Sequence, residues 1–248
     1  KAVGDWQALF GINFRCHHLS WYTMEGEAKR DYPARIFFQS AWWKDYKYVE
    51  DYFARLGLLL SQGDPVCDLL VVNPIESVWA QVYSGAFNNL VPASPEIREM
   101  EKKYADLFHW LAGARVDFDY GGRLASVGKD REGIPVLKVG QASYRTVLVG
   151  NMETMRASTL KLLDDFLKQG GHVVFAGTAP QYVDAQPSAA PDKLAKNAIQ
   201  IDYTREAILP AVEATIRPVV KVTDNSTGKN IPEIFGQVRY DGKRYYIA

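Results

Sequence analysis

Two neighbouring histidines, His17 and His18, stand at the end of the strand-like run INFRCHHL. Successive residues of a strand point to opposite faces, so only one of the two can face a given site. For the same reason, a regular strand does not direct both onto one metal ion. If this run is a barrel strand, the polar groups at its carboxyl end face the active site of the barrel. The competing interpretation packs one histidine and leaves the other at the surface.

The segment after the histidines, about residues 20–41, is a long loop rich in acids and aromatics. Glu25, Glu27 and Asp31 are candidate acid or base groups. Aromatic rings such as Trp21 and Tyr22 can stack on the apolar C–H faces of sugars. For these two, sugar stacking and plain packing both stay open, whereas the helical spacing of Trp43, Tyr46 and Phe53 favours packing. The predicted substrate-binding residues are His17, His18, Trp21, Tyr22 and Asp31.

A second candidate site lies where the strands of a predicted parallel sheet end, because such sheets bind ligands at their carboxyl edge. The residues expected there are Asn73, Gly121, Gly122, Asn151, Gly177 and Thr178. They form no glycine-rich phosphate motif. Asn151 occupies the place where a strand-to-helix elbow would carry a nucleophile. This crevice is therefore predicted to be catalytically silent, and neither a cofactor nor a metal is expected.

Composition narrows the function classes. Lys plus Arg and Asp plus Glu number 29 each, so no net positive charge points to nucleic acid. No apolar run approaches the roughly 20 residues of a membrane span. Cys16 and Cys67 each lie in or beside an apolar run, which favours two buried thiols over a disulfide.

The elements that must position these residues follow from apolar periodicity. Strand-like runs alternate with amphipathic helices from residue 64 to about 222, which predicts an α/β domain with a parallel sheet and helices on both faces. PVVKV, residues 218–222, is its expected last strand. Pro210 is expected to kink or split a helix over 204–216. A helix over 42–60 precedes the domain, and Asp241-Gly242 predicts a β-hairpin after it.

These segments together resemble a known family. FGINFRCHHLSWYTMEGEAKRDYP and QSAWWKDYKYVEDYFARLGLLLSQGDPVCDLLVVNP resemble the end of the catalytic barrel in large bacterial α-L-rhamnosidase-like glycoside hydrolases, family 106 and its relatives. The resemblance continues through FDYGG, the segment from ASYRTVLVGN to GGHVVFAG, and VRYDGKRYYIA. It implies three regions: 1–63 as the last strand and helix of a (β/α)8 barrel, 64–222 as a flavodoxin-like accessory domain, and 223–248 as the start of a β-sandwich-type region.

The resemblance also implies a function. The chain would be a fragment of a glycosidase acting on plant or microbial polysaccharide, in a periplasmic or secreted location. Its partners would be a glycoside substrate and the rest of the same polypeptide. The two carboxylates that glycoside hydrolysis needs would lie upstream, so this piece supplies substrate-binding wall and scaffold. Two other classes stay open: a non-catalytic carbohydrate-binding or oligomerisation module, and a free-standing α/β enzyme.

Overall fold

The computed structural model describes residues 2–16, 21, 23, 25–26, 37–88, 91–92, 94–121, 126–217 and 220–248. Backbone contacts divide the chain into two compact units. Unit 1 comprises Lys1–Val66 and Phe235–Ala248, and unit 2 comprises Cys67–Ile234. The pairing of β1 (Asp64–Pro65) with β15 (Val238–Tyr240) lies inside unit 1. The domain boundaries expected at residues 63 and 222 stay a prediction.

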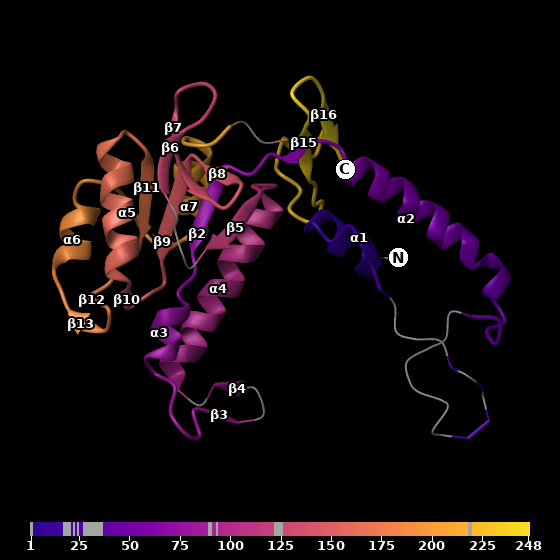
Figure 1. The fold of residues 1–248 in the computed structure, drawn as a ribbon, viewed down its shortest axis with the longest axis horizontal. Helices are drawn as coiled ribbons and strands as arrows, with labels where there is room; N and C mark the ends of the chain where they lie inside the picture. Colours follow the sequence, from indigo (N-terminus) through magenta and orange to yellow (C-terminus); the bar gives the residue numbers. More distant parts are fainter. Residues whose placement is uncertain are drawn as a thin grey trace. The chain divides into compact units, whose positions relative to one another are not determined.

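Unit 1 is built from two helices and a small antiparallel sheet (Figure 1). Its helices are α1 (Ala2–Leu9) and α2 (Tyr46–Leu60), and the short 3-10 helix η2 (Trp43–Asp45) leads into α2. β15 and β16 (Tyr245–Ile247) form the hairpin that Asp241-Gly242 predicts. Gly242 has a φ of +92°, which favours glycine at this turn.

The barrel strand expected at residues 12–19 is not confirmed. Residues 12–16 belong to no strand, and residues 17–20 lie outside the described part of the chain. The described residues form no closed sheet. A barrel strand is held by hydrogen bonds to two neighbouring strands, so residues 12–16 cannot form one without such neighbours. The assignment of residues 1–63 to a barrel stays a prediction.

Unit 2 contains the predicted parallel sheet, which has five strands. In spatial order these are β14 (Ile199–Ile201), β11 (His172–Ala176), β9 (Thr146–Gly150), β2 (Leu69–Val72) and β5 (Phe118–Gly121). All four strand pairs are parallel. Counted along the chain, the spatial order is 2-1-3-4-5, which is the flavodoxin-like order. The order reverses between β2 and β9, which marks the expected ligand-binding crevice.

Two apolar cores cover the two faces of this sheet. Leu70 and Val72 of β2 join the core beneath α5 (Ala157–Lys168) and α6 (Ala190–Ala195). Leu69 and Val71 join the opposite core, beneath α4 (Pro95–Gly113) and α7 (Arg205–Glu213). Successive residues of β2 are therefore buried on opposite faces of the sheet, as the continuous apolar runs predict.

A β-meander replaces a helix in the connection from β5 to β9. Its strands are β6 (Ser126–Lys129), β7 (Pro135–Val139) and β8 (Ala142–Tyr144). Leu137 and Tyr144 are buried in the core on the α5 side of the sheet. Smaller elements complete the unit: α3 (Ile75–Trp79), the pair β3 (Phe87–Asn88) and β4 (Val91–Pro92), and the sheet of β10 (Thr154–Met155), β12 (Tyr182–Val183) and β13 (Gln186–Pro187).

Three local predictions require correction. Residues 220–222 of the expected last strand lie in no strand, and the fifth strand is β14 instead. The helix is not split at Pro210: α7 is a single helix with Pro210 inside it, and its buried residues Ile208 and Val212 lie on both sides of the proline. Cys16 is exposed and Cys67 is half-buried, and neither forms a disulfide.

Candidate functional site

Most of the predicted substrate-binding residues fall outside the described part of the chain. These are His17, His18, Tyr22 and Asp31. Trp21 is described and half-buried, and its carbonyl oxygen accepts a hydrogen bond from Gln39 Nε2 at 3.2 Å. Only one of the five is described, so their role in substrate binding stays a prediction.

The described part of unit 1 nevertheless holds a hollow of about 250 Å³ between α2 and the segment that leads to the histidines. Arg15 places its guanidinium 3.4 Å from the ring centroid of Phe53 on α2. Tyr46, on the same helix, has its pKa raised to about 12 by burial and by the neighbouring Glu50 carboxylate. Arg15 and Phe53 both line the hollow, and the guanidinium packed on the ring agrees with a packing role for Phe53.

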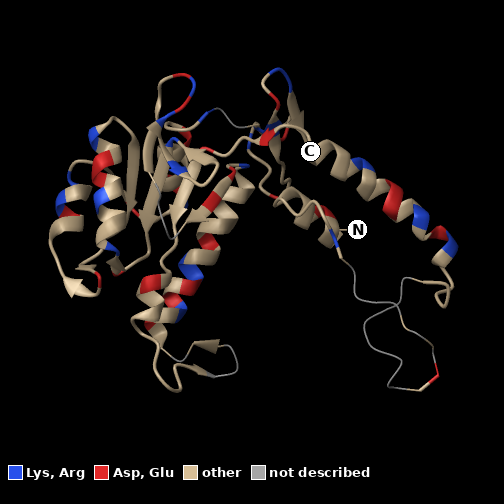
Figure 2. Ribbon diagram, in the orientation of Figure 1, with Lys and Arg blue, Asp and Glu red and all other residues tan. Residues whose placement is uncertain are grey.

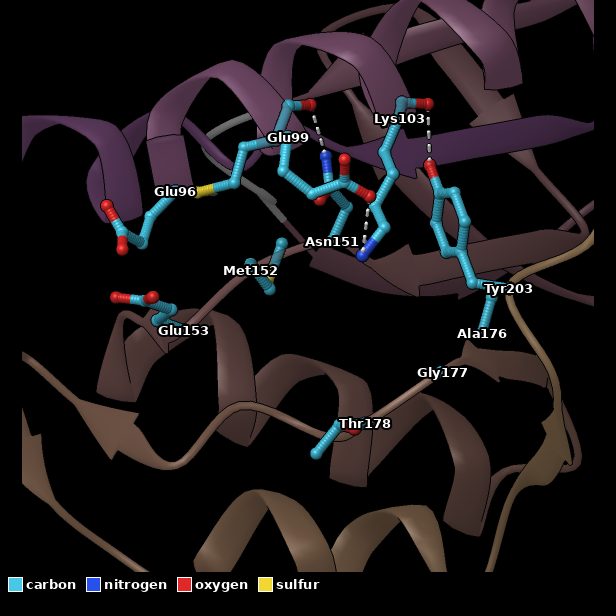
Figure 3. Close-up of a pocket in the computed structure, with 11 residues that line it drawn as sticks. Glu96, Glu99, Lys103, Asn151, Met152, Glu153, Ala176, Gly177, Thr178 and Tyr203 are labelled. Atoms are coloured by element: carbon cyan, nitrogen blue, oxygen red, sulfur yellow. Dashed lines mark hydrogen bonds and ion pairs between the residues drawn. The ribbon is translucent and has the colours of Figure 1, made fainter. Parts of the chain in front are cut away.

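Unit 2 has a cavity of about 320 Å³ at the carboxyl edge of the sheet (Figure 3). Asn151 follows β9, and Gly177 and Thr178 follow β11, as expected for crevice residues. The first two turns of α4 close the cavity from the other side. Its lining residues are Glu96, Glu99, Met100, Lys103, Asn151, Met152, Glu153, Ala176, Gly177, Thr178 and Tyr203.

Local sequence fixes the wall that α4 contributes. Ser94 caps the helix, since its Oγ accepts the Ile97 amide at 3.1 Å. The same hydroxyl donates to Glu96 Oε2 at 2.8 Å. The backbone N–H of Glu96 and the Ser94 hydroxyl both lower the pKa of the Glu96 carboxyl. Glu96 is therefore an anion at neutral pH and does not serve as a proton donor there.

The remaining charged groups of the cavity are partly paired. Lys103 Nζ lies 3.5 Å from Glu99 Oε1, one helical turn away. Glu153 Oε2 accepts from Gln81 Nε2 at 3.0 Å. In Figure 3, Glu96 and Glu153 lie at one end of the cavity, and Tyr203 lies at the other.

Asn151 has a φ of +54°, in the left-handed region that residues other than glycine seldom adopt. Its Nδ2 donates to the Met100 carbonyl at 2.7 Å, which ties the end of β9 to α4. On the far side, the Tyr203 hydroxyl donates to the Lys103 carbonyl at 3.0 Å, and burial raises the pKa of Tyr203. Two hydrogen bonds to α4 carbonyls therefore hold the cavity wall in place.

The lining offers carboxylates, one amine, an amide and two hydroxyls, but no histidine, cysteine or serine. Among the described residues, no group of three or more His, Cys, Asp or Glu could hold a metal ion. This arrangement can bind a ligand through hydrogen bonds. The sequence did not identify four of the lining residues: Glu96, Glu99, Lys103 and Glu153. Three of them lie on a helix and the fourth lies in a bend.

Comparisons with known proteins assign no family to the chain. No family model matches the chain, and no curated protein matches it. Among solved structures, a cold-adapted β-galactosidase from Rahnella sp. R3 is similar, at 15% identity and a TM-score of 0.32. The alignment covers 56% of this chain and 18% of the β-galactosidase, so the chain spans less than a fifth of that protein. Similarity at this level assigns neither a family nor an activity.

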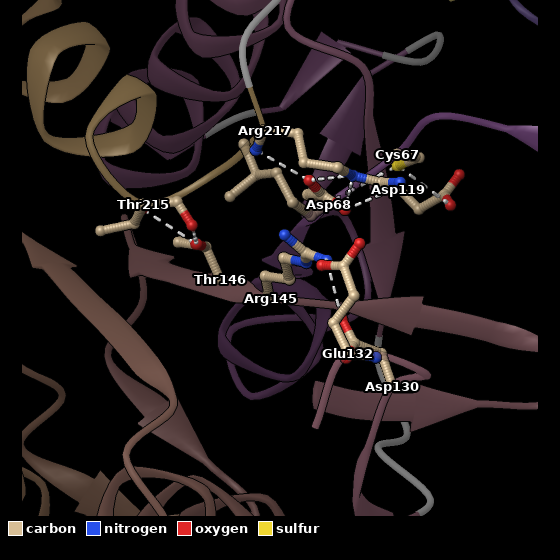
Figure 4. A network of polar contacts seen from close by, with 10 residues as sticks. Cys67, Asp68, Asp119, Asp130, Glu132, Arg145, Thr146, Thr215 and Arg217 are labelled. Atoms are coloured by element: carbon tan, nitrogen blue, oxygen red, sulfur yellow. Dashed lines mark hydrogen bonds and ion pairs between the residues drawn. The ribbon is translucent and has the colours of Figure 1, made fainter. Parts of the chain in front are cut away.

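A network of ion pairs that stabilises the fold lies at the amino edge of the sheet, opposite the cavity (Figure 4). Asp68 pairs with Arg217, and Arg145 pairs with Asp130 at 2.8 Å and with Glu132 at 2.5 Å. These groups bind one another, and the ligand-binding edge of such sheets is the carboxyl one. The network is therefore structural.

Charge and hydropathy elsewhere add two observations. Figure 2 shows both signs of charge interspersed along α2, α4 and α5. No helix in the described part of the chain is long and apolar enough to span a bilayer.

Proposed function

We propose that this chain is part of an α-L-rhamnosidase-like glycoside hydrolase acting on plant or microbial polysaccharide. In this proposal residues 1–63 complete a (β/α)8 catalytic barrel, residues 64–222 form a flavodoxin-like accessory domain, and residues 223–248 open a β-rich domain. His17 or His18, with Trp21, Tyr22 and Asp31, would line the substrate-binding wall. The principal carboxylates would come from earlier barrel strands. The resemblance in the first 74 residues supports this assignment.

One structural observation carries the proposal: the described part of unit 1 has almost no core of its own. Its buried apolar side chains, among the described residues, are Ala8 and Leu60. By contrast Phe14 is 83% exposed, Tyr48 75% and Leu58 67%. An apolar surface this rich needs a further layer of structure to cover it. The remaining strands and helices of a barrel would supply that layer.

The gene provides the test. A coding sequence that supplies seven further barrel strands before residue 1 is expected, and its product should cleave aryl α-L-rhamnosides. The 248-residue chain alone should not, because a catalytic pair must be held to within about 0.5 Å by its surrounding structure. Activity of the chain alone, or a coding sequence with no barrel strands upstream, overturns the proposal.

The predicted histidine has its own test in the product of the whole gene. Substituting each histidine separately, His17→Ala and His18→Ala, should lower kcat/KM clearly for the inward-facing one and little for the other. The outward-facing substitution is the matched control. Equal turnover by both variants and the parent contradicts the role proposed for this strand end.

A second candidate function is a non-catalytic carbohydrate-binding module. The carboxyl-edge cavity of unit 2 favours it, since that cavity is lined by groups that can donate and accept hydrogen bonds. Sugar binding by the chain, combined with a coding sequence that carries no barrel, would identify this alternative.

A further inference from the structure

The carboxyl-edge cavity adjoins a second hollow of unit 2, and the two together are called the groove. The second hollow, of about 380 Å³, shares three lining residues with the cavity: Met152, Glu153 and Thr178. The second hollow continues to Gln181 and Tyr182 on the β12 side. Because the two hollows share a wall, an elongated ligand can occupy both. Each has a volume near the lower end of small-molecule sites, which begin at about 300 Å³.

The polar groups of the groove present acceptors and donors side by side. Glu96, Glu99 and Glu153 supply carboxylate oxygens, and Lys103 supplies an ammonium group. Thr178 adds a hydroxyl that both donates and accepts. A sugar hydroxyl likewise donates one hydrogen bond and accepts others, so vicinal hydroxyls match such a mixed set. A phosphate needs donors alone, and three carboxylates repel it.

An apolar surface lies between these polar groups. Met100 and Met152 are buried at the base of the first hollow, and Ala176 lies beside them. Tyr203 lies in the first hollow, and Tyr182, with 38% exposure, lies in the second. Pyranose rings carry apolar C–H faces with hydroxyls around the rim, which is the pattern that an apolar base with a polar surround recognises.

Charge separates a neutral sugar from an acidic one. Lys103 Nζ lies 3.5 Å from Glu99 Oε1, so the Glu96 and Glu153 carboxylates leave the cavity net negative, and an amine is the ligand that competes with a sugar. Glu96 and Glu153 disfavour uronates. We propose that the groove of unit 2 binds a short neutral oligosaccharide, with one sugar ring in each hollow. This inference deepens the second candidate function, the carbohydrate-binding module, and does not depend on the barrel-wall function.

Calorimetric titration of the 248-residue chain tests the proposal. The probes are L-rhamnose, D-galactose and the neutral di- and trisaccharides of galactose, glucose, mannose and rhamnose. For at least one series, affinity is expected to rise tenfold or more from mono- to disaccharide and then to level off. Putrescine and inorganic phosphate are the competing probes. Tighter binding of either, or saturable binding of none of the sugars, overturns the proposal.

Variants locate the binding. Glu153→Gln, in the wall that both hollows share, should weaken disaccharide binding at least tenfold. Tyr182→Ala should weaken the disaccharide and leave the monosaccharide unchanged. Glu213→Gln, at the far end of α7, is the matched control and should bind like the parent. Thermal unfolding confirms that each variant is folded, and a fourth variant, Thr178→Val, takes the place of any that is not. Equal affinity in parent and groove variants contradicts the site, whereas rhamnosidase activity of the whole gene product tests only the barrel.

Discussion

The Asp68 carboxylate and the Arg217 guanidinium form a two-point ion pair. Arg217 Nη2 donates to Oδ1 at 2.7 Å, and Arg217 Nε donates to Oδ2 at 2.9 Å. The backbone N–H of Arg217 also donates to Oδ2 at 2.9 Å. Asp68 precedes the first strand of the sheet and Arg217 follows its last helix, so the pair joins the two ends of the α/β fold. Asp68 is 5% exposed, which makes its charge dependent on this partner.

Arg217→Ala should therefore destabilise unit 2 by about 3 kcal/mol. That figure is the lower end for breaking a buried pair, since the Arg217 side chain is partly exposed. Chemical denaturation followed by circular dichroism measures the change. Lys168→Ala is the control, because it removes an exposed pair with Asp164 and should leave the stability almost unchanged. Equal losses in the two variants would contradict the structural role of the Asp68–Arg217 pair.

Two glycines of unit 1 should respond in opposite ways to alanine. Gly63 has a φ of +54°, and an added Cβ would overlap the Tyr240 carbonyl and lie 2.7 Å from the Asp241 nitrogen. Gly63→Ala should cost at least about 1–2 kcal/mol from conformation alone. Gly57 lies inside α2, where a Cβ meets nothing within 4 Å, so Gly57→Ala should stabilise the helix by about 0.5–1 kcal/mol.

Tryptophan fluorescence suits this comparison, because Trp6, Trp21, Trp42 and Trp43 all belong to unit 1. The denaturation midpoint should fall for Gly63→Ala and rise for Gly57→Ala. A shift in the same direction for both variants would be inconsistent with the contact between Gly63 and the β15 turn.

Asp224 gives a pH-dependent prediction. Hydrogen bonds from the Ser226 hydroxyl, and from the amides of Thr227 and Ser226, lower the pKa of its carboxyl from 3.8 to about 2. The folded state thus binds this proton less tightly than the unfolded state. The stabilisation is complete above about pH 4 and is lost as the pH falls towards 2. An NMR titration of the Asp224 carboxyl should give a midpoint near 2, and Ser226→Ala should raise it. A midpoint near 3.9, the ordinary value, would show that these bonds do not form.

Apolar runs predicted the central strands correctly, because each is buried on both faces. LLVV, TVLVG and HVVFA all lie in the sheet. The fifth strand was missed, since β14 is three residues long and two of its side chains are exposed at the sheet edge. An edge strand buries less apolar surface, so its sequence carries a weaker signal. PVVKV has the stronger apolar pattern, but its described residues lie outside the sheet.

The candidate cavity was half predictable for a similar reason. Asn151, Gly177 and Thr178 directly follow strands, and strand ends define the carboxyl edge. Glu96 and Lys103 lie on α4, and their position over that edge depends on how the helix packs across the sheet. Sequence periodicity places Ile97, Met100 and Leu107 on the buried face, which leaves several directions open to the neighbouring polar residues.

The two cysteines should differ in reactivity, which bears on whether unit 2 could be a thiol enzyme. Burial, and then the charges of Asp119 and Asp117, raise the pKa of the Cys67 thiol. Its Sγ lies 3.6 Å from Asp119 Oδ2, which also accepts from the Tyr144 hydroxyl at 2.8 Å. The thiolate is the nucleophile, so a raised pKa makes Cys67 inert.

At about pH 8, a disulfide reagent such as DTNB should modify the exposed Cys16 and react with Cys67 on the order of 100-fold more slowly. Cys16→Ser should leave the native protein almost unreactive, and urea should restore one reactive thiol. Fast labelling of Cys67 in that folded variant would reopen nucleophilic chemistry for this domain.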